Sequence, residues 1–260
     1  AGSVLALLLG IPLAWNTANS FPSNAGTIMP TGNMAVARAG HTATLLPDGR
    51  VLIAGGMVRN GEFLAGAELY NPTTGTFSQT GEMTSRRVSH RASLLPDGKV
   101  LITGGLAGRF REAGQWYGNV LSTAELYDPA TGNWTGTGNL NLPREFHAAA
   151  LLQNGKVLVV AGDQADAELY DPVTETWAST EEIDPWLASW GHSLTVLPNG
   201  RALMASGFEP GFGTLTDPRA WQFDPTNSTW MQTASLNIGR YVHTATLLQN
   251  GQVLVVGGGG

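Results

Sequence analysis

The chain is 260 residues long, has a formal net charge of −6, and is rich in glycine (34 residues) but poor in charged residues (13%). The acidic balance argues against a general affinity for nucleic acid, and the composition is typical of a turn-rich β protein rather than of a coiled coil or a disordered chain. Because the chain contains no cysteine, disulfides, thiolate metal sites and cysteine nucleophiles are excluded.

The first feature along the chain is an apolar run at residues 4–15, followed by small and polar residues up to Ser20. A membrane-spanning helix needs about 20 residues, so this run predicts no transmembrane span. The run and the residues after it resemble the core and cleavage region of a signal peptide. We therefore expect residues 1–20 to be a leader and the protein to be secreted or exposed at the cell surface. The alternative is an apolar segment that packs on the folded domain.

One hairpin-like segment occurs five times, at residues 41–56, 90–105, 147–162, 192–207 and 243–258. Each copy has two apolar runs on either side of a Pro-Asp-Gly or Asn-Gly turn, whose glycine supplies the positive φ of a tight β-hairpin. The turn glycines recur every 45 to 57 residues, which is the period of a four-stranded propeller blade.

Two further strands follow each of the first four hairpins. The third strand ends in Asn-Pro or Asp-Pro, which favours a β-turn, and the fourth carries an aromatic anchor (Phe77, Trp134, Trp177, Trp230). The pattern predicts one propeller domain over residues 26–260. Its complete blades are expected at about residues 34–83, 84–140, 141–183 and 184–236, with a partial blade at 237–260 and a lone strand at 26–34.

The repeat also carries the residues of a known family. A Gly-Gly pair follows the second strand (Gly55 and Gly56), a Tyr lies in the third (Tyr70) and a Trp in the fourth (Trp134). In this combination the chain resembles bacterial kelch-repeat proteins and, more distantly, galactose oxidase. The resemblance implies an all-β, kelch-type β-propeller of four-stranded antiparallel blades, with four complete blades and partial blades at both ends.

Kelch propellers usually close with six or seven blades, and closure removes open sheet edges. The fifth blade of this sequence has only two strands before Gly260. We expect further chain to complete it. The alternative is that the strand at 26–34 closes a short ring with those two strands.

The connections between strands divide between two faces of such a fold. Hairpin turns and Asp-Pro turns share one face, while the second-to-third and blade-to-blade connections share the other, which we call the loop-rich face. Its second-to-third connections differ widely in length, at residues 57–66, 106–122, 163–166 and 208–219. Repeat proteins place their varied loops on the binding face, so we expect a ligand there.

Arginine and aromatic residues gather in the sequence of these loops. Arginine donates paired hydrogen bonds to carboxylates, and aromatic rings stack on sugars or anchor a peptide. We expect the ligand-binding residues to be Arg87, Arg109, Arg111, Trp116, Tyr117, Arg144, Trp190, Arg240 and Tyr241. Those of the long 106–122 connection should dominate. The alternative is that the arginines pair with loop carboxylates such as Glu62 and Glu145.

The five histidines occupy one repeat position, one in each blade. Histidines spread over separate blades are too dispersed to bind one metal ion at about 2.0–2.1 Å, so we expect structural hydrogen bonds instead. A repeated Glu in the third strand (Glu68, Glu125, Glu168) is likewise expected to cap or join strands. We assign no catalytic residue, metal or cofactor.

These features favour a monomeric binding module for a glycan or an extracellular protein over an enzyme. The enzymatic alternative is a carbohydrate-active propeller, either a galactose oxidase-like oxidase or a sugar-acid isomerase. The C-terminal segment is similar to the oxidase region that has an adjacent Tyr-His pair, but Val242 separates Tyr241 from His243 and the required Cys is absent. A third alternative, an intracellular scaffold, holds if residues 1–20 are not a signal.

Overall fold

The computed structural model describes residues 30–112, 115–162, 166–181, 183, 190–208 and 216–259, with the backbone alone for residues 110–112 and 115–117. The expected leader and most of the lone strand at 26–34 lie outside these ranges. The chain divides into two units, Ala1–Thr31 and Gly32–Gly260, and all the strands that the structure describes belong to the second. Within the described ranges there is no helix that is long and apolar enough to cross a membrane.

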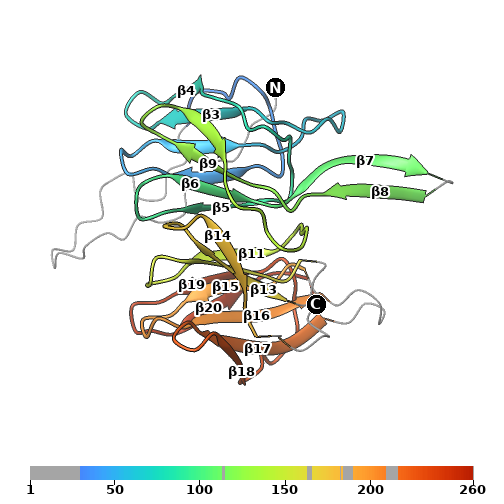
Figure 1. The fold of residues 1–260 in the computed structure, drawn as a ribbon, viewed down its shortest axis with the longest axis vertical. Helices are drawn as coiled ribbons and strands as arrows, with labels where there is room; N and C mark the ends of the chain where they lie inside the picture. The colour runs from blue at the N-terminus through green and yellow to red at the C-terminus, as the bar shows by residue number, and fades with distance from the viewer. Residues whose placement is uncertain are drawn as a thin grey trace. The chain divides into compact units, whose positions relative to one another are not determined.

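Four antiparallel four-stranded sheets form most of this unit (Figure 1). The first has β1 (Thr42–Leu45), β2 (Val51–Ala54), β3 (Ala67–Asn71) and β4 (Thr76–Gln79), and the second has β5 (Arg91–Leu94), β6 (Val100–Thr103), β9 (Ala124–Asp128) and β10 (Asn133–Gly136). The third has β11 (Ala148–Leu151), β12 (Val157–Val160), β13 (Ala167–Asp171) and β14 (Thr176–Ser179), and the fourth has β15 (Ser193–Val196), β16 (Ala202–Phe208), β17 (Thr216–Asp224) and β18 (Thr229–Thr233).

A fifth pair, β19 (Thr244–Leu247) and β20 (Val253–Val256), follows the fourth sheet. The strands of each four-stranded sheet are bonded in chain order. We call these sheets blades one to four, and the β19–β20 pair blade five. The prediction of an all-β chain with four complete blades of four antiparallel strands and a partial fifth is confirmed.

The turns are built from the residues that the sequence indicated. In the first hairpin Gly49 has a φ of 85°, and the backbone N–H of Arg50 donates to Asp48 Oδ1 at 3.0 Å. At the end of β3 the N–H of Thr73 donates to Asn71 Oδ1 at 2.9 Å. Carboxylate and amide side chains thus cap both kinds of turn.

The core lies between consecutive blades, whose first strands lie side by side from β1 through β5, β11 and β15 to β19. Aromatic side chains tie the blades together at the outer strands. Trp134 donates from Nε1 to Gly81 O at 2.8 Å, and the hydroxyls of Tyr127 and Thr80 lie 2.8 Å apart. In blades two and three the repeated Tyr and Trp therefore bind the blade to the one before it.

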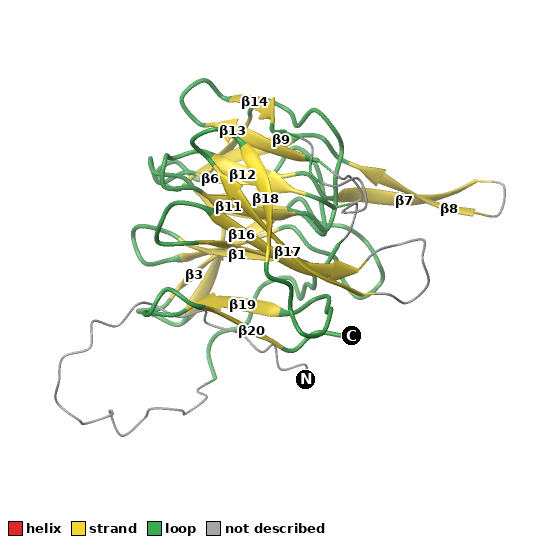
Figure 2. Ribbon diagram, turned by 90° about the horizontal axis from the view of Figure 1, so that it is seen from below, coloured by secondary structure: helices red, strands yellow, loops and turns green. Residues whose placement is uncertain are grey.

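The long connection at residues 106–122 differs from the expected loop. Most of it is a second hairpin, β7 (Leu106–Glu112) paired with β8 (Gln115–Val120), which projects away from the four sheets in both views (Figures 1 and 2). Its aromatic residues have high strand propensity, and the register places Phe110 opposite Tyr117. Two facing aromatic positions favour pairing over an irregular loop.

Candidate functional site

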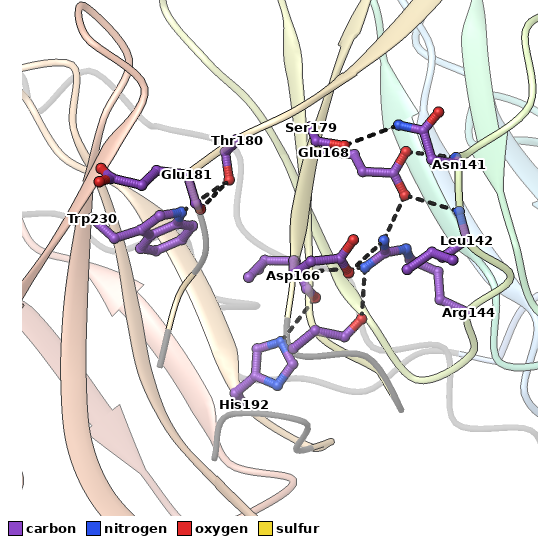
Figure 3. A network of polar contacts seen from close by, with 12 residues as sticks. Asn141, Leu142, Arg144, Asp166, Glu168, Ser179, Thr180, Glu181, His192 and Trp230 are labelled. Atoms are coloured by element: carbon purple, nitrogen blue, oxygen red, sulfur yellow. Dashed lines mark hydrogen bonds and ion pairs between the residues drawn. The ribbon is translucent and has the colours of Figure 1, made fainter. Parts of the chain in front are cut away.

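Two of the arginines expected to bind a ligand, Arg87 and Arg144, are fully buried (0% exposed). Arg87 donates from Nη2 to Glu125 at 2.6 Å and from Nη1 to the carbonyls of Gly104 and Thr123. Arg144 bonds Glu168 at 2.5 Å and Asp166 at 2.9 Å (Figure 3). In the structure these guanidinium groups hold the fold together rather than face solvent.

The glutamates complete a three-way contact. Glu125 accepts from the backbone N–H groups of Thr84 and Ser85, at 2.7 and 3.3 Å, as well as from Arg87. The same contacts occur around Arg38–Glu68 and Arg144–Glu168. We call this unit the Arg–Glu clamp. It fastens the connection that enters a blade to the third strand of that blade, so the expected strand-joining role of these glutamates agrees with their contacts.

The fourth blade has no clamp. Its sequence has Ser189 at the arginine position. Trp221 lies opposite Met204, just as Glu68 lies opposite Ile53 in the first blade. Both charged members have been replaced together, which leaves no uncompensated buried charge.

Each described histidine ring from the second blade onward contacts the preceding blade. Nε2 of His90 lies 3.1 Å from Thr42 Oγ1, and Nε2 of His147 lies 2.8 Å from Thr103 Oγ1. Burial, with a smaller contribution from Arg87, lowers the pKa of His90 to about 3. Burial also lowers the pKa of His192 to about 4. These rings are therefore neutral at pH 7 and serve as inter-blade hydrogen-bonding groups.

Glycines of the Gly-Gly pairs make room for these rings. A Cβ on Gly55 would lie 2.7 Å from both His90 Cε1 and the carbonyl oxygen of Arg87, and its φ is already +64°. Over the described residues no group of three or more His, Asp or Glu side chains is arranged to hold a metal ion.

Four aromatic rings meet on the loop-rich face. Trp190 lies 4.9 Å from Phe208, 5.8 Å from Phe146 and 6.0 Å from Tyr241 between ring centroids, and Phe208 lies 5.4 Å from Tyr241. We call these four residues the aromatic cluster. They come from the entrances of blades three, four and five and from the end of β16, so the structure brings together two residues that the sequence singled out, Trp190 and Tyr241.

Backbone bridges hold the cluster in place. Trp190 pairs with Phe208, and Tyr241 pairs with Gly259. A Cβ on Gly259 would lie 2.6 Å from the Tyr241 ring, so the ring rests directly on this glycine. Sequence reasoning missed Phe146, and it counted Phe208 among the loop aromatics without including it in the nine expected ligand-binding residues. Phe208 stands at the repeat position that Met57 occupies in the first blade. An alignment of the repeats would therefore have identified Phe208 as an aromatic residue at a position that is not aromatic in the first blade.

No known family model matches this chain. A comparison with curated proteins also finds no match.

The remaining expected residues are spread over other places. Arg109 is exposed on the projecting hairpin, and the side chains of Arg111, Trp116 and Tyr117 lie outside the described part of the structure. Arg240 is partly buried and donates from Nη1 to Gly257 O at 2.8 Å. The structure therefore divides eight of the nine expected residues among the buried clamps, the hairpin and the aromatic cluster, and places Arg240 against the backbone of Gly257 in blade five.

A pocket of about 450 Å³ lies beside the start of β3. Its lining includes Glu62, Glu82 and Arg86, with Phe63 as its aromatic residue. None of the nine expected ligand-binding residues lines it. Because its charges are mixed and it offers one ring, it is a weaker candidate for ligand binding than the aromatic cluster.

Proposed function

We propose that this chain is a kelch-type propeller that binds a glycan or an extracellular protein through its loop-rich face, with a glycan as the favoured ligand. The observation that carries the proposal is the aromatic cluster. Partly exposed rings that converge from separate loops provide stacking surfaces for sugar rings or pockets for an anchor residue.

The fold itself does not require aromatic residues at these places. The equivalent bridges in the first two blades join Ala39 to Met57 and Val88 to Leu106. Phe146 is 41% exposed although it is a large apolar residue. Exposed aromatic groups that gather at one place are more typical of a binding surface than of a core.

The repeat residues support the kelch assignment. The Tyr and Trp of the outer strands and the glycines after the second strand all make inter-blade contacts that a blade repeat requires. Secretion or display at the cell surface remains part of the proposal and depends on the apolar run at residues 4–15, which lies outside the described residues.

A glycan panel tests this proposal. Neutral and acidic glycans are incubated with the protein, and bound and free material are identified by mass spectrometry. Replacing a central ring (Trp190→Ala or Phe208→Ala) should weaken retention about tenfold or more, as truncation of a buried aromatic anchor does. Met57→Ala is the matched control, since it changes the same repeat position in the first blade, and should retain the glycan unchanged.

Two outcomes would count against a binding module. If no glycan or extracellular protein is retained, or if the ring variants bind as well as the control, the aromatic cluster is not the site. If the glycan is released in oxidised or isomerised form, the enzymatic alternative replaces the proposal.

A further inference from the structure

Arg91, the first residue of β5, is a partly buried cation that has no counter-charge among the described residues. Burial lowers its pKa from the ordinary arginine value, and no described carboxylate acts against this effect. Its guanidinium makes no hydrogen bond to an acceptor in the described ranges. Because it is costly to take an isolated charge out of water, a guanidinium in this environment favours an anionic group beside it.

The fold does not require an arginine at this position. The residues that directly follow the other four histidines are all small: Thr42, Ala148, Ser193 and Thr244. In blades one and four the hydroxyl of this residue contacts the histidine of the next blade. In blade two Thr103, which lies opposite Arg91 on β6, makes this contact to His147 instead. The guanidinium is therefore not needed for the bond between blades.

The side chain of Arg91 faces blade three. Its neighbours along β5, Ala92 and Leu94, pack against the hydrophobic cluster between blades one and two, and side chains one residue apart in a strand point to opposite sides. On the other side lies β11, whose first three residues are alanines that leave room for a long side chain. Burial lowers the pKa of His147 and of His192, and the charge of Arg91 lowers both further, which agrees with this direction.

The same side of β5 adjoins the aromatic cluster. The N–H of Phe146 donates to Ser89 O at 3.1 Å, and Ser89 lies two residues before Arg91. His147 directly follows Phe146, and His192 lies two residues after Trp190. The guanidinium, which acts on both histidines, therefore lies near the backbone that carries two rings of the cluster.

We propose that the ligand of the aromatic cluster is an acidic glycan whose carboxylate binds Arg91. This inference rests on the proposed glycan-binding function and names the class of ligand. A planar guanidinium donates two parallel hydrogen bonds to a carboxylate, while the rings stack on the apolar faces of the sugars. A neutral glycan makes the second kind of contact but not the first.

Other arginines at the entrances of blades two and three are engaged elsewhere. Arg87 and Arg144 are bonded to the glutamates of their clamps. Arg86 lines the separate pocket beside β3. Arg91 thus keeps its donors for a ligand, and it is the group that distinguishes an acidic glycan from a neutral one at the cluster.

The test measures the affinity of the whole chain for matched fluorescent probes by anisotropy. The probes are tetragalacturonate and sialyllactose, each compared with its methyl ester, which has the same sugars without the charge. We expect an acid to bind about tenfold or more tightly than its ester, because the ester cannot form the charged pair. Arg91→Gln should reduce the affinity for the acid to that for the ester and leave the affinity for the ester unchanged.

Two further variants keep the test decisive. Arg86→Gln removes a positive charge from the same connection and should preserve the preference for the acid. If Arg91→Gln does not fold, Arg91→Lys retains the charge without the paired donors and should weaken binding of the acid but not of the ester.

The proposal is overturned if neither acid binds more tightly than its ester, or if the preference survives in the Arg91 variants. In that case ester binding that still depends on Trp190 and Phe208 would leave the glycan-binding function intact. If no glycan binds at all, both proposals are wrong.

Discussion

At the scale of single residues, the Arg–Glu clamp is the strongest local constraint in the molecule. Arg87 and Glu125 have side chains exposed by only 0% and 2%, and they are joined at 2.6 Å. Charges so deeply buried are stable only as a pair, and removal of one partner leaves the other uncompensated.

Glu125→Gln should therefore lower the free energy of unfolding by about 3–5 kcal/mol, because the Arg87 guanidinium stays buried without its counter-charge. Urea unfolding followed by circular dichroism measures the change. Asp97→Asn is the control, since Asp97 pairs with Lys99 at an exposed turn at 3.8 Å and should cost less than about 1 kcal/mol. Equal effects of the two substitutions would show that the clamp is not a stabilising element.

The buried histidines predict a pH dependence of stability. The folded-state pKa values of His90 and His192 are lowered to about 3 and about 4, whereas an unfolded histidine titrates near 6.5. Below about pH 6.5 the unfolded chain binds more protons than the folded one, so stability falls as the pH is lowered towards 4.

Unfolding free energies measured between pH 7 and pH 5 should decline, with each buried histidine contributing up to about 1.4 kcal/mol per pH unit at the acidic end. In His192→Gln the unfolding free energy should change less steeply with pH, because the unfolded chain then binds one proton fewer. An unchanged pH slope in that variant would contradict the prediction.

Sequence reasoning foresaw a structural role for the histidines and for Glu68, Glu125 and Glu168, but it expected the clamp arginines to face a ligand. The partners Arg87 and Glu125 are 38 residues apart, and spacing alone does not reveal that they meet. The fourth blade has Ser189 at the arginine position and Trp221 at the glutamate position. The absence of both charges from the same blade was the feature of the sequence that indicated a pairing of the two positions.

At the scale of elements, the repeat predicts the strands well because every hairpin combines a turn glycine with two apolar runs. It fails for β7 and β8, which have no counterpart in the other blades. The aromatic residues Phe110, Trp116 and Tyr117 indicated strand propensity there, but periodicity between blades offered no guide.

The tip of this hairpin is dispensable for folding if the blades carry the stability. Joining Gly108 directly to Gly118 removes the tip and leaves a Gly-Gly turn suited to a two-residue hairpin. It preserves the bridge between Val88 and Leu106 and the packing of Leu106 against Gly118.

Thermal and urea unfolding of this deletion should show a change below about 1 kcal/mol. Its glycan retention, measured in parallel, shows whether Arg109 and the rest of the tip contribute to binding. A large loss of stability would show that the tip packs on the blades.

At the scale of the whole folded unit, each blade is fastened mainly to its neighbours. The first strands meet in succession, and each hydrophobic cluster is made by two consecutive blades. The stability of such a linear array is approximately the sum of the stabilities of the single blades and of the interfaces between neighbouring blades. The sequence predicts this array from its period, but it does not predict the aromatic cluster, because that depends on which loops of different blades approach one another.

The clamp also restricts which substitutions the blades of such an array can accept. A blade that loses only its arginine or only its glutamate must pass through a form with a lone buried charge, and that form is several kcal/mol less stable. Two changes far apart in the sequence must therefore accompany each other. The fourth blade carries neither charge, with Ser189 and Trp221 at the two positions, so this constraint does not act on its entrance.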